Sequence, residues 1–253
     1  MLAEERRNEI LAAIQRDGRA LVTELSHTFG TSSLTIRKDL DLLERRGLVQ
    51  RTHGGALPVN SNAMADPALG EKEKQHHKEK LRIAAAAAGM VKKGQCIILD
   101  SGSTTTAIAR ALRGFDGLTV VTNAVNIAAE LAGSKVEVLL TGGTLRKNSF
   151  SLVGPHTEEF LRGIYADTLF LGVDGFDTAA GLSTPNVLEA TVNRAMLKSA
   201  HRVVAVCDSS KFGRRSLALI APVSSINCVI TDKALNTSTV EALRSSGVEV
   251  LLV

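Results

Sequence analysis

The chain has 253 residues, of which 44% are hydrophobic and 22% are charged, and its formal net charge is +4. These values are typical of a globular protein with one large domain, or with a small domain and a medium-sized one. No apolar run approaches the roughly 20 residues of a membrane-spanning helix, and the modest positive charge permits nucleic-acid binding without demanding it.

The cysteines and the N-terminal residues indicate in which cellular compartment the protein is found. Cys96, Cys207 and Cys228 are odd in number, far apart and set in apolar runs. This pattern indicates buried thiols in a reducing compartment rather than disulfides or a metal site. At the N-terminus acids precede bases and no apolar core follows, which does not fit a signal peptide. We therefore expect a cytoplasmic protein with no membrane association and no metal or cofactor.

Residues 1–58 are predicted to form a winged helix-turn-helix domain. Apolar residues at helical spacing indicate a helix over 4–16, a second that ends at Gly30 and a third that begins at Ser32. A short strand over 48–52 and a tight turn over 53–56 follow. Three short helices followed closely by a β-hairpin describe this fold, in which the third helix enters the DNA major groove.

The third helix carries most of the predicted DNA contacts. Ser32 suits its N-cap, and Ile36, Leu40 and Leu43 form its apolar face. Leu34 lies on the opposite face, where it would be odd on a plain surface helix but could meet thymine methyl groups. The predicted contacts lie on the polar side of this helix and in the hairpin: Ser32, Ser33, Leu34, Thr35, Arg37, Lys38, Arg45, Arg51, His53 and Gly54.

The excess positive charge of this domain is confined to one part of its sequence. Residues 1–58 hold nine Lys/Arg and eight Asp/Glu, whereas residues 37–53 hold five bases and three acids. The positive charge is thus concentrated where phosphate contacts would be made. A protein-interaction module with a solvated charged face is the alternative. Because one copy of so neutral a domain would bind weakly, we expect two copies to pair at a fixed spacing on double-stranded DNA.

Residues 59–77 are predicted to be a linker. They are polar at first and then dense in charge, and they include the adjacent His76 and His77. Two histidines without a third ligand nearby favour a solvated segment over a metal site.

Residues 78–253 alternate between helical patterns and short runs rich in Val, Ile and Leu. Because the strands are apolar on both faces, we expect an α/β domain with a mostly parallel sheet covered by helices. Strands are predicted at 96–99, 118–122, 136–140, 168–173, 203–207, 228–231 and 248–253. Helices are predicted at 78–91, 103–111, 124–131, 157–163, 187–200 and 237–246.

Polar residues gather after five of these strands, where a parallel sheet binds its ligands. The segment from Ser101 to Thr105 has the features of an anion cradle, since Gly102 lets backbone approach and a helix N-terminus follows. Gly-Lys-Ser/Thr and Gly-x-Gly-x-x-Gly are both absent, so the phosphate of a small molecule suits it best. An ordinary helix cap without a ligand is the alternative.

The predicted effector-binding residues follow from this placement. Asp100, Asn123, Asp174 and Glu189 could hydrogen-bond sugar hydroxyls, and Lys211 could add a second positive group, although each could instead shape a turn or cap. The complete set is Asp100, Ser101, Gly102, Ser103, Thr104, Thr105, Thr122, Asn123, Gly142, Gly143, Asp174, Gly175, Glu189 and Lys211.

The run Thr35-Ile36-Arg37-Lys38-Asp39-Leu40, with residues 51–56, resembles the N-terminal signature of the DeoR family of bacterial transcription regulators. Residues 99–105, 121–123, 141–143, 152–154, 171–175, 208–212 and 230–232 resemble the second part of that family. The resemblance implies an effector domain similar in fold to ribose-5-phosphate isomerase and glucosamine-6-phosphate deaminase. It also implies a sugar phosphate or related metabolite as effector and repression of carbohydrate-use operons by dimers or tetramers. Lys38 departs from the family's frequent arginine, which favours phosphate contact there.

An isomerase-like fold raises the alternative of a sugar-phosphate isomerase. That reaction needs a carboxylate base, and Asp174 and Asp177 flank a suitable loop. However, Gly172-Val173-Asp174-Gly175 replaces the isomerase's Gly-Ala-Asp-Glu. We therefore expect a regulator with no catalytic residue. A protein–protein adaptor that does not bind DNA is a third alternative.

Overall fold

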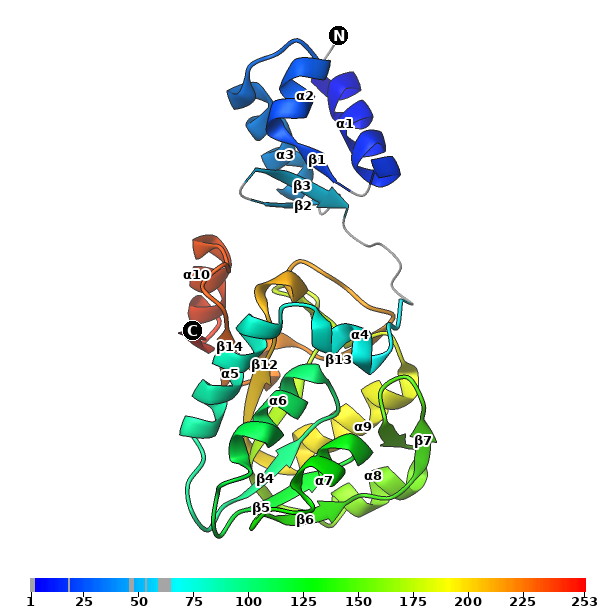
Figure 1. The fold of residues 1–253 in the computed structure, drawn as a ribbon, viewed down its shortest axis with the longest axis vertical. Helices are drawn as coiled ribbons and strands as arrows, with labels where there is room; N and C mark the ends of the chain where they lie inside the picture. Colours follow the sequence, from blue (N-terminus) through cyan, green and yellow to red (C-terminus); the bar gives the residue numbers. More distant parts are fainter. Residues whose placement is uncertain (1–2, 18, 46–47, 53, 59–64) are drawn as a thin grey trace. The chain divides into compact units, whose positions relative to one another are not determined.

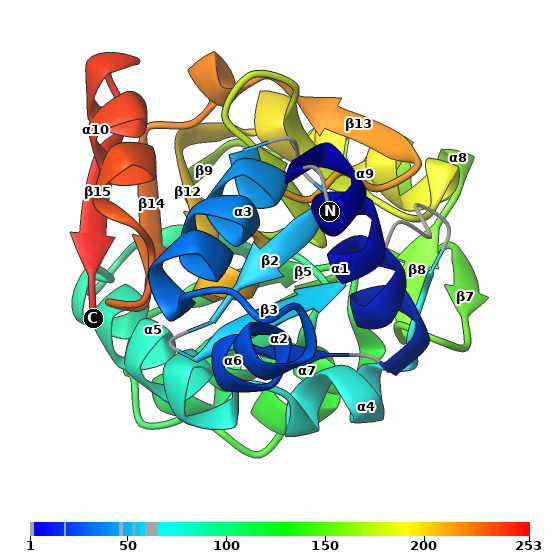
Figure 2. The same cartoon turned by 90° about the horizontal axis from the view of Figure 1, so that it is seen from above.

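The computed structural model describes residues 3–17, 19–45, 48–52, 54–58 and 65–253. The chain splits into two compact units, Met1–Ala63 and Met64–Val253, and each is described by itself (Figures 1 and 2). His53 and residues 59–64, on which predictions were made, lie outside the described residues. No helix in the described part of the chain is long and apolar enough to cross a membrane.

The first unit has the predicted three helices and wing. Its elements are α1 (Ala3–Asp17), β1 (Ala20–Leu21), α2 (Val22–Thr28), α3 (Ser33–Arg45), β2 (Val49–Arg51) and β3 (Gly55–Pro58). The strands form an antiparallel sheet in the order β1-β3-β2. Ile10 and Ile14 of α1 pack with Ile36, Leu40 and Leu43 of α3 in a small core. The apolar stripe predicted for the third helix is therefore its buried face.

The second unit is built on a seven-stranded sheet in which every neighbouring pair is parallel. The order is β15 (Glu249–Leu252), β14 (Cys228–Thr231), β12 (Ala200–Val206), β9 (Ala166–Gly172), β4 (Cys96–Leu99), β5 (Thr119–Thr122) and β6 (Glu137–Leu140). Figure 2 shows β14, β15 and α10 (Thr237–Ser245) at one end and β7 (Thr144–Arg146) with β8 (Ser151–Val153) at the other. The predicted α/β class is confirmed.

Helices cover both faces of this sheet (Figure 1). Helices α5 (His77–Gly89), α6 (Ser103–Leu112) and α7 (Val125–Leu131) lie on one face, and α8 (Pro155–Arg162), α9 (Val187–Lys198) and α10 on the other. Alternate strand residues face opposite sides of the sheet. Phe170 packs on the side covered by α5, α6 and α7, whereas Leu169 and Leu171 pack on the side covered by α8, α9 and α10. Burial on both faces explains why the strands have continuous apolar runs.

The strand order reverses between β4 and β9. From β4 the chain proceeds outward through β5 to β6, and then returns to β9 and continues the other way through β12, β14 and β15. The carboxyl ends of β4 and β9 therefore flank a topological switch point, where a parallel sheet leaves a crevice for ligands.

Several short strands were not predicted. Strands β7 (Thr144–Arg146) and β8 (Ser151–Val153) form an antiparallel hairpin within a predicted loop. Strands β10 (Gly175–Asp177), β11 (Gly181–Thr184) and β13 (Ala218–Ala221) form a separate antiparallel sheet. Such short strands lack a long apolar run, and distant pairing stabilises them.

The predicted linker over 59–77 must be corrected in its second half. Residues 65–77 belong to the second unit, where α4 (Leu69–Lys74) and the first residue of α5 are formed. Leu69 is buried and its amide donates to the carbonyl of Asn148 (2.7 Å). Tertiary contacts, which the charge-dense sequence does not reveal, thus hold this stretch against the rest of the second unit.

Candidate functional site

Helix α3 presents a polar face with one exposed leucine. Leu34 is 62% exposed, whereas Ile36 on the opposite side is fully buried. Ser32 caps the helix as predicted, because its hydroxyl accepts from the amide of Thr35 (3.2 Å). Arg37 is exposed and has no ion-pair partner in the described part of the unit.

The remaining predicted contacts on α3 surround this face. Ser33 and Thr35 are half-buried, and Lys38 and Arg45 are exposed. The Thr35 hydroxyl also lies 2.9 Å from the Ser32 hydroxyl. Lys38 and Arg45 form no ion pair with any residue that the structure describes, so both are available to a DNA phosphate.

Asp39 is the acidic residue of α3 that is buried, whereas Asp41 and Glu44 are not. Its side chain is 6% exposed and accepts from Arg6 Nε (2.7 Å) and Arg7 Nε (3.0 Å) of α1. The two arginines neutralise the carboxylate and fix α3 to α1. Sequence reasoning missed this contact because the partners belong to different helices and are remote in sequence.

Arg51, predicted to contact DNA, braces the wing against α3. Its Nε donates to Asp41 (3.0 Å), its Nη1 to the Gly55 carbonyl (3.0 Å), and its amide to Glu44 (2.9 Å). Two of the five guanidinium N–H groups are thus used within the unit, and a DNA contact by Arg51 remains a prediction. Gly54 is exposed at the tip of the wing.

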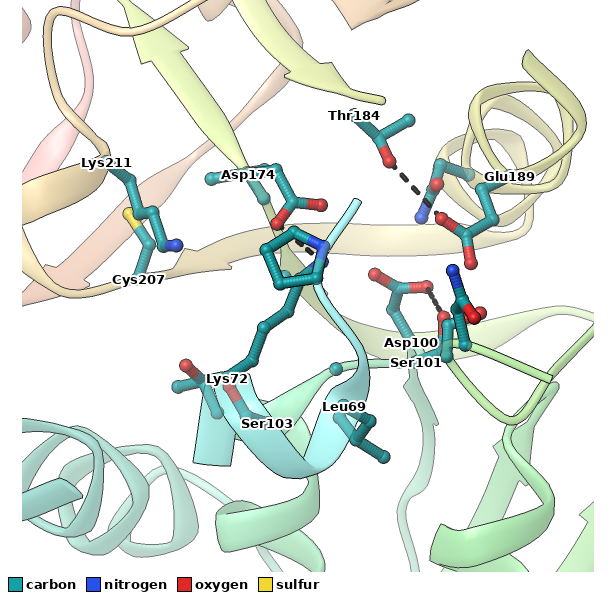
Figure 3. Close-up of a pocket in the computed structure, with 18 of the residues that line it drawn as sticks. Leu69, Lys72, Asp100, Ser101, Ser103, Asp174, Thr184, Glu189, Cys207 and Lys211 are labelled. Atoms are coloured by element: carbon teal, nitrogen blue, oxygen red, sulfur yellow. Dashed lines mark hydrogen bonds and ion pairs between the residues drawn. The ribbon is translucent and has the colours of Figure 1, made fainter. Parts of the chain in front are cut away.

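In the second unit, a cavity lies at the switch point, where β4, β9 and β12 end (Figure 3). Eight predicted effector-binding residues line it: Asp100, Ser101, Gly102, Ser103, Thr104, Asp174, Glu189 and Lys211. Gly102 adopts a φ of +154°, which L residues rarely adopt, and α6 begins at the next residue. The helix N-terminus therefore supplies backbone N–H groups and positive dipole at this edge of the cavity.

Three lysines from different elements line the cavity: Lys72 of α4, Lys80 of α5 and Lys211 of η1 (Ser209–Lys211). Figure 3 shows Lys72 reaching to Asp174, and its Nζ donates to that carboxylate (2.8 Å). Burial lowers the pKa of Lys72, but the carboxylates of Asp174 and Asp66 outweigh it and raise the pKa above its ordinary value. Lys72 is therefore charged.

Lys80 is a buried lysine on the apolar side of α5. Its Nζ donates to the carbonyls of Lys72 and Gln75, the second at 2.5 Å. Burial lowers the pKa of Lys80 from its ordinary value. Lys211 forms no ion pair with the residues that the structure describes. The cavity thus holds one lysine paired to a carboxylate, one bound to carbonyls and one available to an anion.

Carboxyl groups line the opposite wall. Glu189 accepts from Ser151 Oγ (2.8 Å) and Thr184 Oγ1 (3.3 Å), and Arg146 forms an ion pair with it. Asp100 is 4% exposed, and burial, followed by the nearby Glu189 charge, raises its pKa well above the usual range. A carboxyl group with a raised pKa can donate as well as accept a hydrogen bond, which suits recognition of a hydroxyl or carbonyl.

Three polar residues predicted to bind the effector do not line the cavity. Thr105 donates to the Gly102 carbonyl (3.0 Å) and Thr122 to the Leu99 carbonyl (2.7 Å). Asn123 donates to the Leu152 carbonyl (3.1 Å). Strand β5, which ends at Thr122, lies on the far side of β4 from the switch point. These side chains tie strand ends to neighbouring loops.

Three predicted glycines also lie away from the lining. The carbonyl of Gly142 accepts from Thr157 Oγ1 (2.6 Å). A Cβ on Gly143 would lie 2.2 Å from Thr157 Oγ1, and one on Gly175 would lie 2.5 Å from Ser183 Oγ. Close packing therefore accounts for glycine at 143 and 175 without a ligand.

The cavity has lining residues that sequence reasoning missed. Besides Lys72 and Lys80 they include Pro67, Leu69, Asn148, Ser149, Gly172, Val173, Thr184, Asn193 and Cys207. One signal was available: Lys80 occupies the buried stripe of α5 with Ile83, Ala84 and Ala87. A lysine at helical spacing within an apolar stripe is unusual and indicates a buried polar partner.

Of the two carboxylates considered for isomerase chemistry, Asp174 lines the cavity and Asp177 does not. Asp177 accepts from Arg215 Nε (2.8 Å) and from the amides of Ala179 (2.9 Å) and Ala180 (2.7 Å), and it does not line the cavity. The desolvation that raises its pKa is outweighed by these donors, which lower it. In the described residues no group of three His, Cys, Asp or Glu could hold a metal.

Comparison with known proteins matches both units. A model of the DeoR-like helix-turn-helix domain matches residues 6–62, and one of the DeoR C terminal sensor domain matches residues 75–233. A putative aga operon transcriptional repressor of Escherichia coli O157:H7 is 41% identical over 251 residues, which cover 98% of this chain and 93% of that protein. The HTH-type transcriptional regulator GlpR of Haloferax volcanii is 41% identical over 252 residues, which cover 99% and 98%.

Among solved structures, ribose 5-phosphate isomerase A of Methanocaldococcus jannaschii aligns with 55% of each chain at 18% identity and a TM-score of 0.42. The two family models follow the order of the two units, and the curated relatives share nearly the full length of the chain. The chain belongs to the DeoR family of transcriptional regulators.

Proposed function

We propose that the chain represses a carbohydrate-use operon in the cytoplasm, binding operator DNA as a homodimer or homotetramer. A phosphorylated sugar or related metabolite in the cavity controls this binding allosterically. The observation that carries the proposal is the composition of the cavity, where a helix N-terminus and lysines adjoin carboxyl and amide groups. Repression is supported by the name of the relative from Escherichia coli.

The basic side of the cavity supports a phosphate. Ser103 and Thr104 lie in the first turn of α6, and Lys211 has no competing ion pair in the part of the chain that the structure describes. Backbone N–H groups, hydroxyls and one ammonium group are the donors that phosphate oxygens accept from. A neutral sugar would leave these donors without an anion.

The acidic side supports a polyhydroxylated body. Asp100, Glu189, Asn193 and Thr184 line this wall, so both donors and acceptors face the cavity. A sugar hydroxyl both donates and accepts, and matched groups of this kind give orientation and specificity.

Two copies are needed for tight binding to DNA. Residues 1–58 carry nine basic and eight acidic side chains, so a single copy neutralises few phosphates. Pairing two recognition helices at a fixed spacing raises the affinity and also lengthens the DNA sequence that is read. A ligand changes operator affinity if it favours one placement of the paired helices over another.

Thermal unfolding tests the ligand. The panel is glycerol 3-phosphate, ribose 5-phosphate and fructose 6-phosphate, each with its unphosphorylated parent. At 100 times its dissociation constant, a ligand adds about 2.7 kcal/mol and raises the Tm of a unit of this size by roughly 5–11 °C. Ser103→Ala and Lys211→Ala should abolish the shift and the response of DNA binding, while DNA affinity without ligand is kept.

Lys93→Ala is the matched control, because Lys93 is exposed and pairs with Asp116 away from the cavity. Equal shifts for a sugar and its phosphate would contradict a phosphate site, and normal responses in both cavity variants would place the ligand elsewhere. DNA binding is tested with a duplex selected by the wild-type protein from a random pool. Its affinity should fall steeply with added salt.

A further inference from the structure

Arg146 joins the wall of the cavity to the segment that precedes α4. Its Nη1 forms an ion pair with Glu189 Oε1, and its Nη2 donates to Asp66 Oδ2 (2.5 Å). The three side chains are only 15%, 10% and 17% exposed. Glu189 lines the cavity, whereas Asp66 stands shortly after the segment 59–64. One guanidinium therefore bridges a cavity residue and the chain that leads from the DNA-binding unit.

Residues 66–72, here called the strap, are held to the sensor unit mainly by polar contacts. The Leu69 amide donates to the Asn148 carbonyl (2.7 Å), and the Asn148 side chain donates to the Asp66 carbonyl (3.4 Å). Lys72 at the far end pairs with Asp174 (2.8 Å). Charge-assisted contacts of this kind depend strongly on what occupies the neighbouring space.

The cavity beneath the strap is too small for a sugar phosphate as it stands. Its volume is about 50 Å³, roughly the space of three to five water molecules. Pro67, Leu69 and Lys72 of the strap form part of its lining. A ligand of that size must therefore displace wall residues, and the strap, in which Leu69 is the one buried apolar side chain, is part of that wall.

We propose that Arg146 is a positioning residue that couples the cavity to the strap. This inference rests on the proposed function, since it describes how a ligand in that cavity is sensed. A ligand hydroxyl that donates to Glu189 competes with Arg146 for the carboxylate and shifts the guanidinium. Among the described residues, the Asp66 carboxylate then pairs with Lys72 alone (3.8 Å), which belongs to the strap itself. The strap, which follows residues 59–64 in the chain, thereby loses this tie to the rest of the second unit.

Arginine is suited to this bridge because its planar fork offers donors to two carboxylates at once. Lysine keeps the charge but cannot hold both partners in this geometry. Arg146→Lys should therefore keep the fold and ligand binding while it weakens the coupling. Asp66→Asn removes the charge from the strap end of the same bridge.

The test uses the full chain without ligand first. Hydrogen exchange at the Leu69 amide should accelerate at least tenfold in Arg146→Lys and in Asp66→Asn, and the dissociation constant of the selected duplex should change at least fivefold. The double variant should add little, because both changes break one bridge. Arg113→Lys, an exposed arginine paired with Glu130, is the control and should stay within twofold.

Unchanged Leu69 exchange, or unchanged duplex affinity, in both single variants would overturn the bridge as a coupling element. A second arm adds the phosphorylated sugar that raises the wild-type Tm. Arg146→Lys should keep that Tm shift but lose most of the change in duplex affinity, and a response equal to wild type would overturn the inference. If no sugar phosphate shifts the wild-type Tm, the proposed effector fails, whereas the ligand-free arm still decides the bridge.

Discussion

Replacing Asp39 by alanine tests how α3 is held against α1. The Asp39 side chain is 6% exposed and binds the Nε groups of Arg6 and Arg7 at 2.7 and 3.0 Å. Removing one partner of a buried ion pair costs about 3–5 kcal/mol. Because the arginines keep 15% and 17% exposure, water screens part of this loss, and we expect about 2–3 kcal/mol.

Hydrogen exchange in the intact chain isolates this effect from the second unit. Amides of Leu40 and Leu43 in α3 should exchange roughly 30- to 150-fold faster in Asp39→Ala, which corresponds to that free energy. Asp39→Asn keeps the side-chain shape and one acceptor oxygen, so it should lose about half as much stability. Glu9→Ala, an exposed residue of α1, makes the same charge change and is the control. Exchange within threefold of wild type in Asp39→Ala would refute the argument.

Three further predictions concern other parts of the chain. Leu34→Ala should change the free energy of unfolding by no more than about 0.5 kcal/mol, since the side chain is 62% exposed. It should weaken binding of the selected duplex about tenfold, and an affinity equal to wild type would contradict an apolar base contact. Burial raises the pKa of Asp100 above its ordinary 3.8, so the folded chain binds that proton more tightly than the unfolded chain, and stability is lost as pH rises above about 4. Asp100→Asn, which cannot ionise, should therefore raise the Tm more at pH 8 than at pH 4, and a difference independent of pH would contradict this sign. Gly143→Ala should lower the free energy of unfolding in urea by more than about 2 kcal/mol, because its Cβ would meet Thr157 Oγ1 at 2.2 Å at a φ of +121°, and a tolerated alanine would show that the turn relaxes.

The central strands were predictable because their apolar runs are local signals. Strands β4 and β14 match the predicted ranges, since each is four buried or nearly buried residues between polar turns. Strands β10 and β11 were missed, because glycine and polar residues dominate them. They are strands because they pair with each other, with β11 also pairing β13. Local patterns do not encode such pairing.

The expectation that polar residues after the strands form one binding site identified the centre of the cavity. It also included residues after strands that do not border the cavity. Asp100 and Asp174 follow β4 and β9, which are neighbours at the switch point. Asn123 and Gly142 follow β5 and β6, which lie one and two strands beyond β4. Every parallel strand has a polar end, but only the strand order decides which ends share a crevice, and the sequence pattern does not supply that order.

The strap could not be predicted for a different reason. Proline, glycine and charged residues give it the pattern of a solvated segment. Its partners are remote in sequence, because Asp66 binds Arg146 and Lys72 binds Asp174. Ion pairs at this separation leave no local periodicity. Lys72, which lines the cavity, and Asp66, which binds Arg146, were consequently assigned to a linker.

The most direct test of allosteric control measures duplex affinity with and without ligand. Fluorescence anisotropy gives the dissociation constant of the selected duplex, alone and with a phosphorylated sugar at 100 times its own dissociation constant. We predict at least a tenfold change, and by linkage the same factor in ligand affinity when DNA is saturating. A sugar phosphate that raises the Tm of the chain yet leaves the duplex dissociation constant within twofold would contradict this control.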